Sequence, residues 1–347
     1  MFWWFSRKFL HFQRSKLYVT TPVLTFYISR APLSTSDGLT AANEVLELAG
    51  WPSDNVTFLR SLNAAEFTLK MENAANNSWA IAVDQLVLSD LPRNLYSDSN
   101  LAINAPQSIV VGFNSMDGIV AEPWGYGAVP ETDKEYKLLI ADYFGNESIQ
   151  SALYSYYYPP SDFPKYHYSP KGSYNSYQLA WWTMNGDVCV LCPSLKLAEQ
   201  ISSNVRTPQT FVYEFNGPEQ DHSYRAPHAA ELPFVFNWGA EWEEFYRIPW
   251  DQTLSDSMLS SWVHLGRYGT PNITNGADEV HVDWKRFHIE NGNVLLFQTE
   301  HGGIRNVEDF TEKYRNNVCD FWYNKVGEDM MTEICLDQMK LHKLARF

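Results

Sequence analysis

The sequence has few of the features that place a protein in a membrane or on a nucleic acid. No run of about 18 or more apolar residues occurs, so we expect no membrane-spanning helix. Basic residues are scarce, because 26 Lys and Arg stand against 41 Asp and Glu, which gives a net charge of −15. A surface this acidic repels phosphate backbones and argues against nucleic acid as a partner. With 45% hydrophobic and 19% charged residues, the 347-residue chain can still bury a large core.

Cysteine is scarce as well, with four in the chain. Cys189 and Cys192 have the Cys-x-x-Cys spacing of redox and zinc sites. A second such pair is absent, and no strand leads directly into a helix here, as a thioredoxin-like site requires. Several histidines are scattered without metal-ligand spacing: His222, His264, His281, His288 and His342. We therefore expect no metal and no cofactor.

The N-terminal segment and the rest of the chain give conflicting indications of where the protein is located. Met1–Lys16 is aromatic, but Ser6, Arg7 and Lys8 interrupt it, so it does not match a secretory signal peptide. The body of the chain nevertheless contains four Asn-x-Ser/Thr acceptor sites, which are used only in the secretory pathway. These predicted glycosylation sites are Asn55, Asn76, Asn146 and Asn272.

Strands alternate with helices along the chain, which predicts an α/β fold with a parallel sheet. Apolar runs predict strands over residues 24–29, 108–114 and 210–216. Helical spacing and a stop signal predict a helix over residues 39–50. We also expect a helix over residues 254–266, led by Asp251 and Thr253, and a last helical stretch over residues 308–325. The tyrosines and prolines of residues 151–171 indicate an irregular, turn-rich insert.

An acidic residue and a histidine each follow a predicted buried strand. Asp117 lies in a turn that ends in Gly118, directly after the strand 108–114, and His228 lies in the loop after the strand 210–216. The carboxyl ends of parallel strands carry the site in open sheets, and acid followed by His is the order of an α/β-hydrolase triad after its nucleophile. Taken singly, each residue is more often an ordinary loop residue.

Five motifs strengthen this interpretation because they occur in the order of a known family. They are IVVGFNSMDG at 109–118, DVCVLCP at 187–193, APHAAELPFVF at 226–236, a helix from Asp251 that closes in Tyr-Gly-Thr-Pro-Asn at 268–272, and CDFW at 319–322. From about Leu24 onward, the chain resembles the later part of the carboxylesterase type B family, the cholinesterase-like esterases. The resemblance implies an incomplete α/β-hydrolase fold, a small-molecule carboxylic ester as substrate, and a secreted or lumenal protein.

The resemblance also implies roles for individual residues. Asp117 takes the place of the catalytic acid, where most members have Glu, and His228 that of the catalytic histidine. Glu231 would brace the His228 loop. Cys192 would pair with Cys319, which leaves the two remaining cysteines, Cys189 and Cys335, as a second pair or as free thiols.

The chain departs from the family pattern in several places. No Gly-x-Ser-x-Gly nucleophile motif occurs in the 347 residues, and the family's upstream oxyanion loop is missing. The run His301–Gly303 follows the catalytic His, so we interpret it as a hairpin turn. Trp51 and Phe58 occupy the positions of an early family disulfide. We therefore expect no ester hydrolysis from this chain alone.

These departures lead to two hypotheses. We divide the chain into a non-matching segment, residues 1–23, and an esterase-like part, residues 24–347. In this family's fold, Leu24–Ser29 should pair with the strand that leads into the nucleophile, and that strand is not among these residues. The first hypothesis is therefore that the chain is a truncated product of a longer esterase. The alternative is a non-catalytic, cholinesterase-like module that recognises a protein partner.

Aromatic residues are abundant, with 20 Phe, 20 Tyr and 13 Trp. Trp181, Trp182 and the cluster Tyr154–Tyr158 have two interpretations. They would attract a quaternary ammonium group if they lined a gorge, as in cholinesterase-like enzymes. The simpler interpretation, which we prefer, is that they fill the core.

Overall fold

The computed structural model describes residues 33–48, 50–51, 56–65, 67, 82–83, 85, 89–90, 94, 108–119, 130–163, 174–203, 209–217, 226–239, 250–273, 282–299, 303–315, 317–331 and 334–335. The predicted strand 24–29, the segment 1–23 and the sequons at Asn55 and Asn76 lie outside these residues. No helix in the described ranges is long and apolar enough to cross a membrane.

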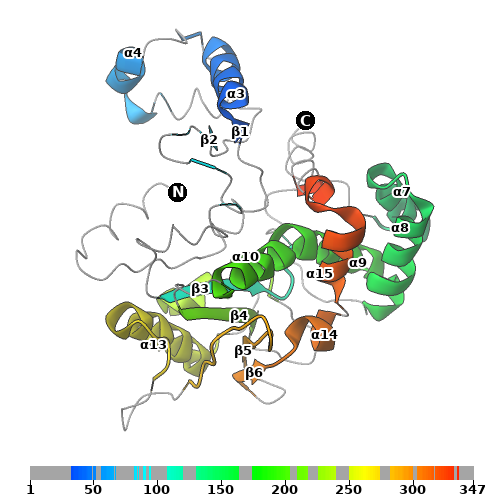
Figure 1. The fold of residues 1–347 in the computed structure, drawn as a ribbon, viewed down its shortest axis with the longest axis vertical. Helices are drawn as coiled ribbons and strands as arrows, with labels where there is room; N and C mark the ends of the chain where they lie inside the picture. Colours follow the sequence, from blue (N-terminus) through cyan, green and yellow to red (C-terminus); the bar gives the residue numbers. More distant parts are fainter. Residues whose placement is uncertain are drawn as a thin grey trace.

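A four-stranded mixed sheet forms the centre of the fold (Figure 1). Its strands lie side by side in chain order: β3 (Ser108–Asn114), β4 (Gln209–Gly217), β5 (Val294–Gln298) and β6 (Arg305–Val307). The first three are parallel and β6 pairs antiparallel with β5. Every side chain of β3 is buried, as expected for a parallel strand covered on both faces. The strands predicted at 108–114 and 210–216 are thus present, whereas β5 and β6 were not predicted.

Helices cover both faces of this sheet. α10 (Cys192–Ser202) contacts β3 and β4 on one face, and α13 (Gln252–Tyr268) lies on the opposite face (Figure 1). Asp251 caps the start of α13 by accepting from the backbone N–H of Leu254, and Gly269 ends it at φ 73°. The helix predicted at 254–266 is therefore slightly longer than its apolar spacing indicated.

Of the aromatic residues with two interpretations, Trp181 and Tyr158 are buried in the core, Trp182, Tyr154 and Tyr157 pack half-buried against it, and Tyr156 is exposed. Other aromatic side chains fill the core around β4. Tyr213 on β4 makes edge contacts with Trp262, Trp284 and Phe297 at centroid distances of 5.2, 6.0 and 5.9 Å. Its ring also covers Gly112 of β3, where any Cβ would lie 1.8 Å from a ring carbon. A glycine in the middle of β3 is thus required by the neighbouring tyrosine.

One long helical segment carries two of the cysteines. It runs through α9 (Ser176–Gly186), the π-helical turn η6 (Asp187–Leu191) and α10. Disulfides join Cys192 to Cys319 and Cys189 to Cys335. The first is the pairing that the resemblance implied, and the second settles the alternatives left open for the other two cysteines.

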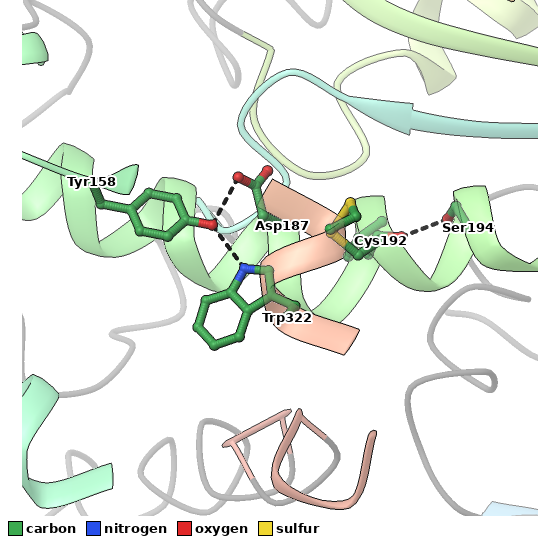
Figure 2. Close-up of a disulfide and its surroundings, with 7 residues drawn as sticks. Tyr158, Asp187, Cys192, Ser194 and Trp322 are labelled. Carbon is green, nitrogen blue, oxygen red and sulfur yellow. Dashed lines mark hydrogen bonds between the residues drawn. A yellow bond between two sulfur atoms is a disulfide. The ribbon is translucent and has the colours of Figure 1, made fainter. Parts of the chain in front are cut away.

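Beside the Cys192 disulfide lies a buried polar contact (Figure 2). The Tyr158 hydroxyl donates to Asp187 at 3.0 Å and accepts from the Trp322 indole N–H at 2.9 Å. Tyr158, from the predicted insert, is therefore a core residue that connects the long helix to the C-terminal helices.

One prediction of secondary structure was wrong, and another was right in type but missed an interruption. Part of the predicted irregular insert is helical: α8 (Glu147–Ala152), capped by Asn146, continues into the π-helical turn η4 (Leu153–Tyr157), and a 3-10 turn η5 (Pro160–Asp162) follows. Packing of the tyrosines against the core outweighs their turn-like sequence.

The predicted helix 308–325 is divided into α14 (Phe310–Arg315), α15 (Val318–Phe321) and the π-helical turn η8 (Trp322–Val326), because Asn317 adopts φ 54°.

The remaining described elements are shorter or lie in the N-terminal part of the chain. They are β1 (Leu33–Ser34), α3 (Thr35–Leu48), α4 (Val56–Ser61), β2 (Ala82–Val83), α7 (Asp133–Tyr143) and α11 (Leu232–Phe236). The predicted helix 39–50 corresponds to α3. A small cluster contains buried Leu46 and Trp51 with half-buried Phe58 and Phe67, and Trp51 stacks on Phe67 at a centroid distance of 5.6 Å.

Candidate active site

The acid turn follows directly from β3. Asp117 is buried, and its Oδ2 accepts a hydrogen bond of 2.6 Å from the backbone N–H of Asn114. Gly118 comes next because the backbone of α9 passes against this turn: a Cβ at Gly118 would lie 1.8 Å from the carbonyl oxygen of Trp182. Glycine at position 118 is therefore required by the close packing of this turn against α9.

Backbone hydrogen bonds join the acid turn to the loop that carries His228. Met116 N–H donates to the carbonyl of Ala226 at 2.9 Å, and His228 N–H donates to the carbonyl of Ile119 at 2.9 Å. Ser115 accepts from Ala226 N–H through its hydroxyl at 3.0 Å. These bonds hold the histidine loop against the acid turn independently of the Asp117 and His228 side chains.

The two predicted site residues meet at the end of the sheet. His228 Nδ1 lies 2.9 Å from Asp117 Oδ1. The Asp117 side chain is 2% exposed and that of His228 is 18% exposed, so the carboxylate lies inside and the imidazole at the edge. A buried carboxylate on Nδ1 fixes the imidazole tautomer, because Nδ1 carries the proton that the carboxylate accepts.

Competing effects set the protonation of His228. Burial acts to lower the pKa of His228, because it disfavours the imidazolium. The hydrogen bond to Asp117 and the negative charges of Asp117 and Glu231 act in the opposite direction and prevail, so the pKa of His228 is raised. The site therefore stabilises a protonated imidazole.

A second buried carboxyl group lies behind this pair. Glu231 is 1% exposed, and its Oε2 accepts from the Asn114 side-chain N–H at 2.6 Å. Burial and the nearby charge of Asp117 raise the pKa of Glu231 to about 7. Between the histidine and Glu231, Ala229 holds φ 66°, a left-handed conformation that favours glycine.

Sequence reasoning found Asp117, His228 and Glu231 but did not single out Asn114. Its signal was present, because Asn114 belongs to the motif IVVGFNSMDG at 109–118, which contributes to the resemblance. Its contacts could not be read from the turn itself, since its side chain contacts Pro227 and Glu231, more than a hundred residues away in sequence.

Two of the scattered histidines, His264 and His288, belong to the described residues. His264 contacts the carbonyl of Thr270 at 3.1 Å and His288 is exposed, while His222, His281 and His342 fall outside the described residues. Within the described part of the chain, no group of three His, Cys, Asp or Glu side chains is arranged to hold a metal. β5 and β6 flank the predicted hairpin, of which only Gly303 belongs to the described residues.

Two of the four sequons can be placed. Asn146 is exposed and its side-chain oxygen caps α8. Asn272 is half-buried, and its Oδ1 accepts from the backbone N–H of Trp284 at 2.6 Å. Their glycosylation stays a prediction.

Comparison with known proteins supports the resemblance read from the motifs. A family model described as "Carboxylesterase family" matches residues 29–322. A cholinesterase from Mus musculus is 24% identical over 331 residues, which cover 87% of this chain and 51% of that protein. Two solved structures share the fold: a thermophilic PNB esterase (TM-score 0.56, 14% identity) and a PNB esterase (TM-score 0.55, 15% identity). Each match covers 86% of this chain and about 60% of the esterase. The chain thus spans about half to three fifths of the relatives it matches.

Proposed function

Because the chain belongs to the carboxylesterase family and has the α/β-hydrolase fold, we propose that Asp117 and His228 are the acid and the base of a site that hydrolyses carboxylic esters. The observation that supports this most is the contact of 2.9 Å between Asp117 Oδ1 and His228 Nδ1. Asp is one methylene shorter than the Glu of most members, and this contact means that the shorter side chain still reaches the imidazole.

The proposed reaction has two halves that use the same imidazole. His228 Nε2 takes the proton of a serine hydroxyl as its oxygen attacks the ester carbonyl carbon, and the proton then passes to the departing alcohol. Water then gives a proton to Nε2 as its oxygen attacks the acyl carbon, and Nε2 returns that proton to the serine oxygen as the carboxylic acid leaves. Asp117 stabilises the imidazolium in both halves, and the raised pKa of His228 agrees with this role.

We place the serine outside these 347 residues, because no Gly-x-Ser-x-Gly occurs among them. The chain alone is therefore proposed to be inactive, with the complete site formed in a longer native protein. The two disulfides fit an oxidising compartment, and we propose that the native protein is secreted or lies in the secretory lumen.

The test is hydrolysis of p-nitrophenyl acetate by the full-length native protein, expressed from its complete transcript. We expect His228→Ala to lower kcat by about 10⁴- to 10⁶-fold and Asp117→Asn by about 10⁴-fold. The matched control is His288→Ala, an exposed histidine outside the two loops that carry the dyad, which should leave the rate unchanged.

The opposite result would favour the second hypothesis. A full-length protein that is folded but hydrolyses no ester, with or without these substitutions, would overturn the esterase proposal. The missing motif would then indicate a cholinesterase-like recognition module, and a protein partner would be sought in place of a substrate.

A further inference from the structure

A buried amide lies where the acid turn, the histidine loop and Glu231 meet. Asn114 is the last residue of β3 and is 3% exposed. Its backbone N–H donates to Asp117 at 2.6 Å, while its side-chain nitrogen donates to the Pro227 carbonyl at 2.9 Å and to Glu231 at 2.6 Å. One residue thus contacts the proposed acid, the residue before the proposed base, and the second buried carboxyl group.

We propose that Asn114 is a positioning residue, which holds the His228 loop in register with Asp117, and that Glu231 is the acceptor that fixes the orientation of its amide. This inference rests on the proposed role of the dyad. Asn114 acts through its neighbours and not on a reacting atom.

The chemistry of the contacts explains why the residue is Asn. Both acceptors that face its side chain are oxygens, so the nitrogen must point toward them, and the reversed amide would set three oxygens together. Asp would do the same with an added negative charge. Ala would leave the Pro227 carbonyl and Glu231 buried without this donor, and unpaired buried acceptors are costly in a low dielectric.

Glu231 suits the acceptor role over a wide pH range. A carboxyl group keeps an acceptor oxygen whether or not it is ionised, so the bond from Asn114 persists when Glu231 titrates. Its second oxygen, Oε1, is buried and has no hydrogen-bond partner among the described residues. The titratable groups around it are Asp117 and His228 in the two loops and Tyr213 on β4, whose pKa is raised by burial and by the charges of Glu231 and Asp117.

The test observes the imidazole directly. In the full-length protein, the downfield ¹H NMR signal of the His228 Nδ1–H and its pH titration report the Asp117 contact without any need for turnover. We expect Asn114→Ala to remove or broaden this signal and to lower the titration midpoint by about one pH unit or more, because the contact with Asp117 loosens. Glu231→Gln keeps an acceptor, so it should keep the signal and lower the midpoint only through the lost charge.

A matched control separates positioning from general stability. Asn293 is also fully buried, and its side-chain nitrogen donates to the Lys285 carbonyl and to Asn306, both at 3.1 Å, away from the dyad. We expect Asn293→Ala to lower Tm as Asn114→Ala does, while it leaves the His228 signal and titration unchanged.

The result against the proposal is an Asn114→Ala protein that loses stability but keeps the wild-type signal and midpoint. Should Asn114→Ala not fold, Glu231→Ala decides in its place: the proposal requires the signal in Glu231→Gln and its loss in Glu231→Ala. Because these readouts involve no ester, absence of hydrolysis would overturn the proposed function and leave this inference standing, whereas an unchanged imidazole in an active enzyme would overturn the inference alone.

Discussion

At the scale of single residues, the site places two acidic side chains close together in a buried part of the structure. Asp117 and Glu231 are both buried and both interact with His228. The Asp117 carboxylate accepts hydrogen bonds from the imidazole and from the Asn114 N–H. The nearby charge of Asp117 raises the pKa of Glu231, which therefore keeps its proton to a higher pH. The residues that surround a proposed base thus determine its charge as much as the base itself does.

This arrangement predicts a pH-dependent stability. Burial and Asp117 raise the pKa of Glu231 from 4.5 to about 7, so the folded state binds a proton that the unfolded state has already lost between these values. The contribution of Glu231 to the free energy of unfolding is therefore fully present below about pH 4.5. It is lost as the pH rises to about 7, which lowers the free energy of unfolding by about 3 kcal/mol. The raised pKa of His228 has the same sign, because its contribution is present below its unfolded pKa and is lost as the pH rises through the folded value.

Urea unfolding at pH 5 and at pH 8 checks this, with Glu231→Gln as the comparison. Gln does not titrate, so the difference in unfolding free energy between wild type and Glu231→Gln should change by roughly 2 to 3 kcal/mol across this range. A difference that stays constant with pH would show that Glu231 is ionised throughout.

At the scale of elements, two backbones approach so closely that only glycine fits between them. Gly118 of the acid turn and Gly186 of α9 face each other, and a Cβ on either would lie under 3 Å from backbone atoms of the other segment. Since backbone atoms cannot rotate away, the acid turn would have to move off α9 if a side chain were added.

We therefore expect Gly118→Ala to destabilise the protein by several kcal/mol, roughly 3 or more, as overpacking against fixed backbone does. The matched control is Gly145→Ala, between α7 and α8, where a Cβ meets no atom within 4 Å; it should change stability by less than about 1 kcal/mol. Thermal unfolding of both variants measures the contrast, and equal melting temperatures would contradict the close packing seen here.

The elements also show what local sequence can and cannot predict. Strand 108–114 was predicted with its observed bounds, because seven buried residues in a row leave few alternatives to a parallel strand. β5 was missed because VLLFQ is too short for periodicity to separate strand from helix. The Asp117–His228 contact followed from motif order, whereas the Asn114 contacts join loops far apart in sequence and needed the fold.

At the scale of the whole molecule, two neighbouring disulfides fasten the C-terminal segment to the long helix. Cys189 and Cys192 are three positions apart, and their partners Cys335 and Cys319 are 16 positions apart. Once one bond is formed across 127 or 146 residues, the other closes only a small additional ring of about 20 residues. The two bonds are therefore not independent in their effect on the unfolded chain.

The expected stabilities follow from ring size. Removing either disulfide alone, by Cys189→Ala with Cys335→Ala or by Cys192→Ala with Cys319→Ala, should cost about 3 kcal/mol, because the remaining bond still closes the large loop. Removing both should cost about 8 kcal/mol, which is more than twice either single loss. Urea unfolding of the three variants tests this, and a double loss no larger than the sum of the single losses would contradict it.

The central proposal is that this chain supplies the acid and the base of an esterase whose serine lies elsewhere in the native protein. The most direct measurement is to purify the native protein with an antibody against this chain, treat it with a fluorophosphonate, and map the modified peptide by mass spectrometry. We predict a modified serine in a Gly-x-Ser-x-Gly peptide that is absent from the 347 residues and covalently continuous with them. A native protein that carries no modified serine, while a known serine esterase in the same sample is labelled, would contradict the proposal.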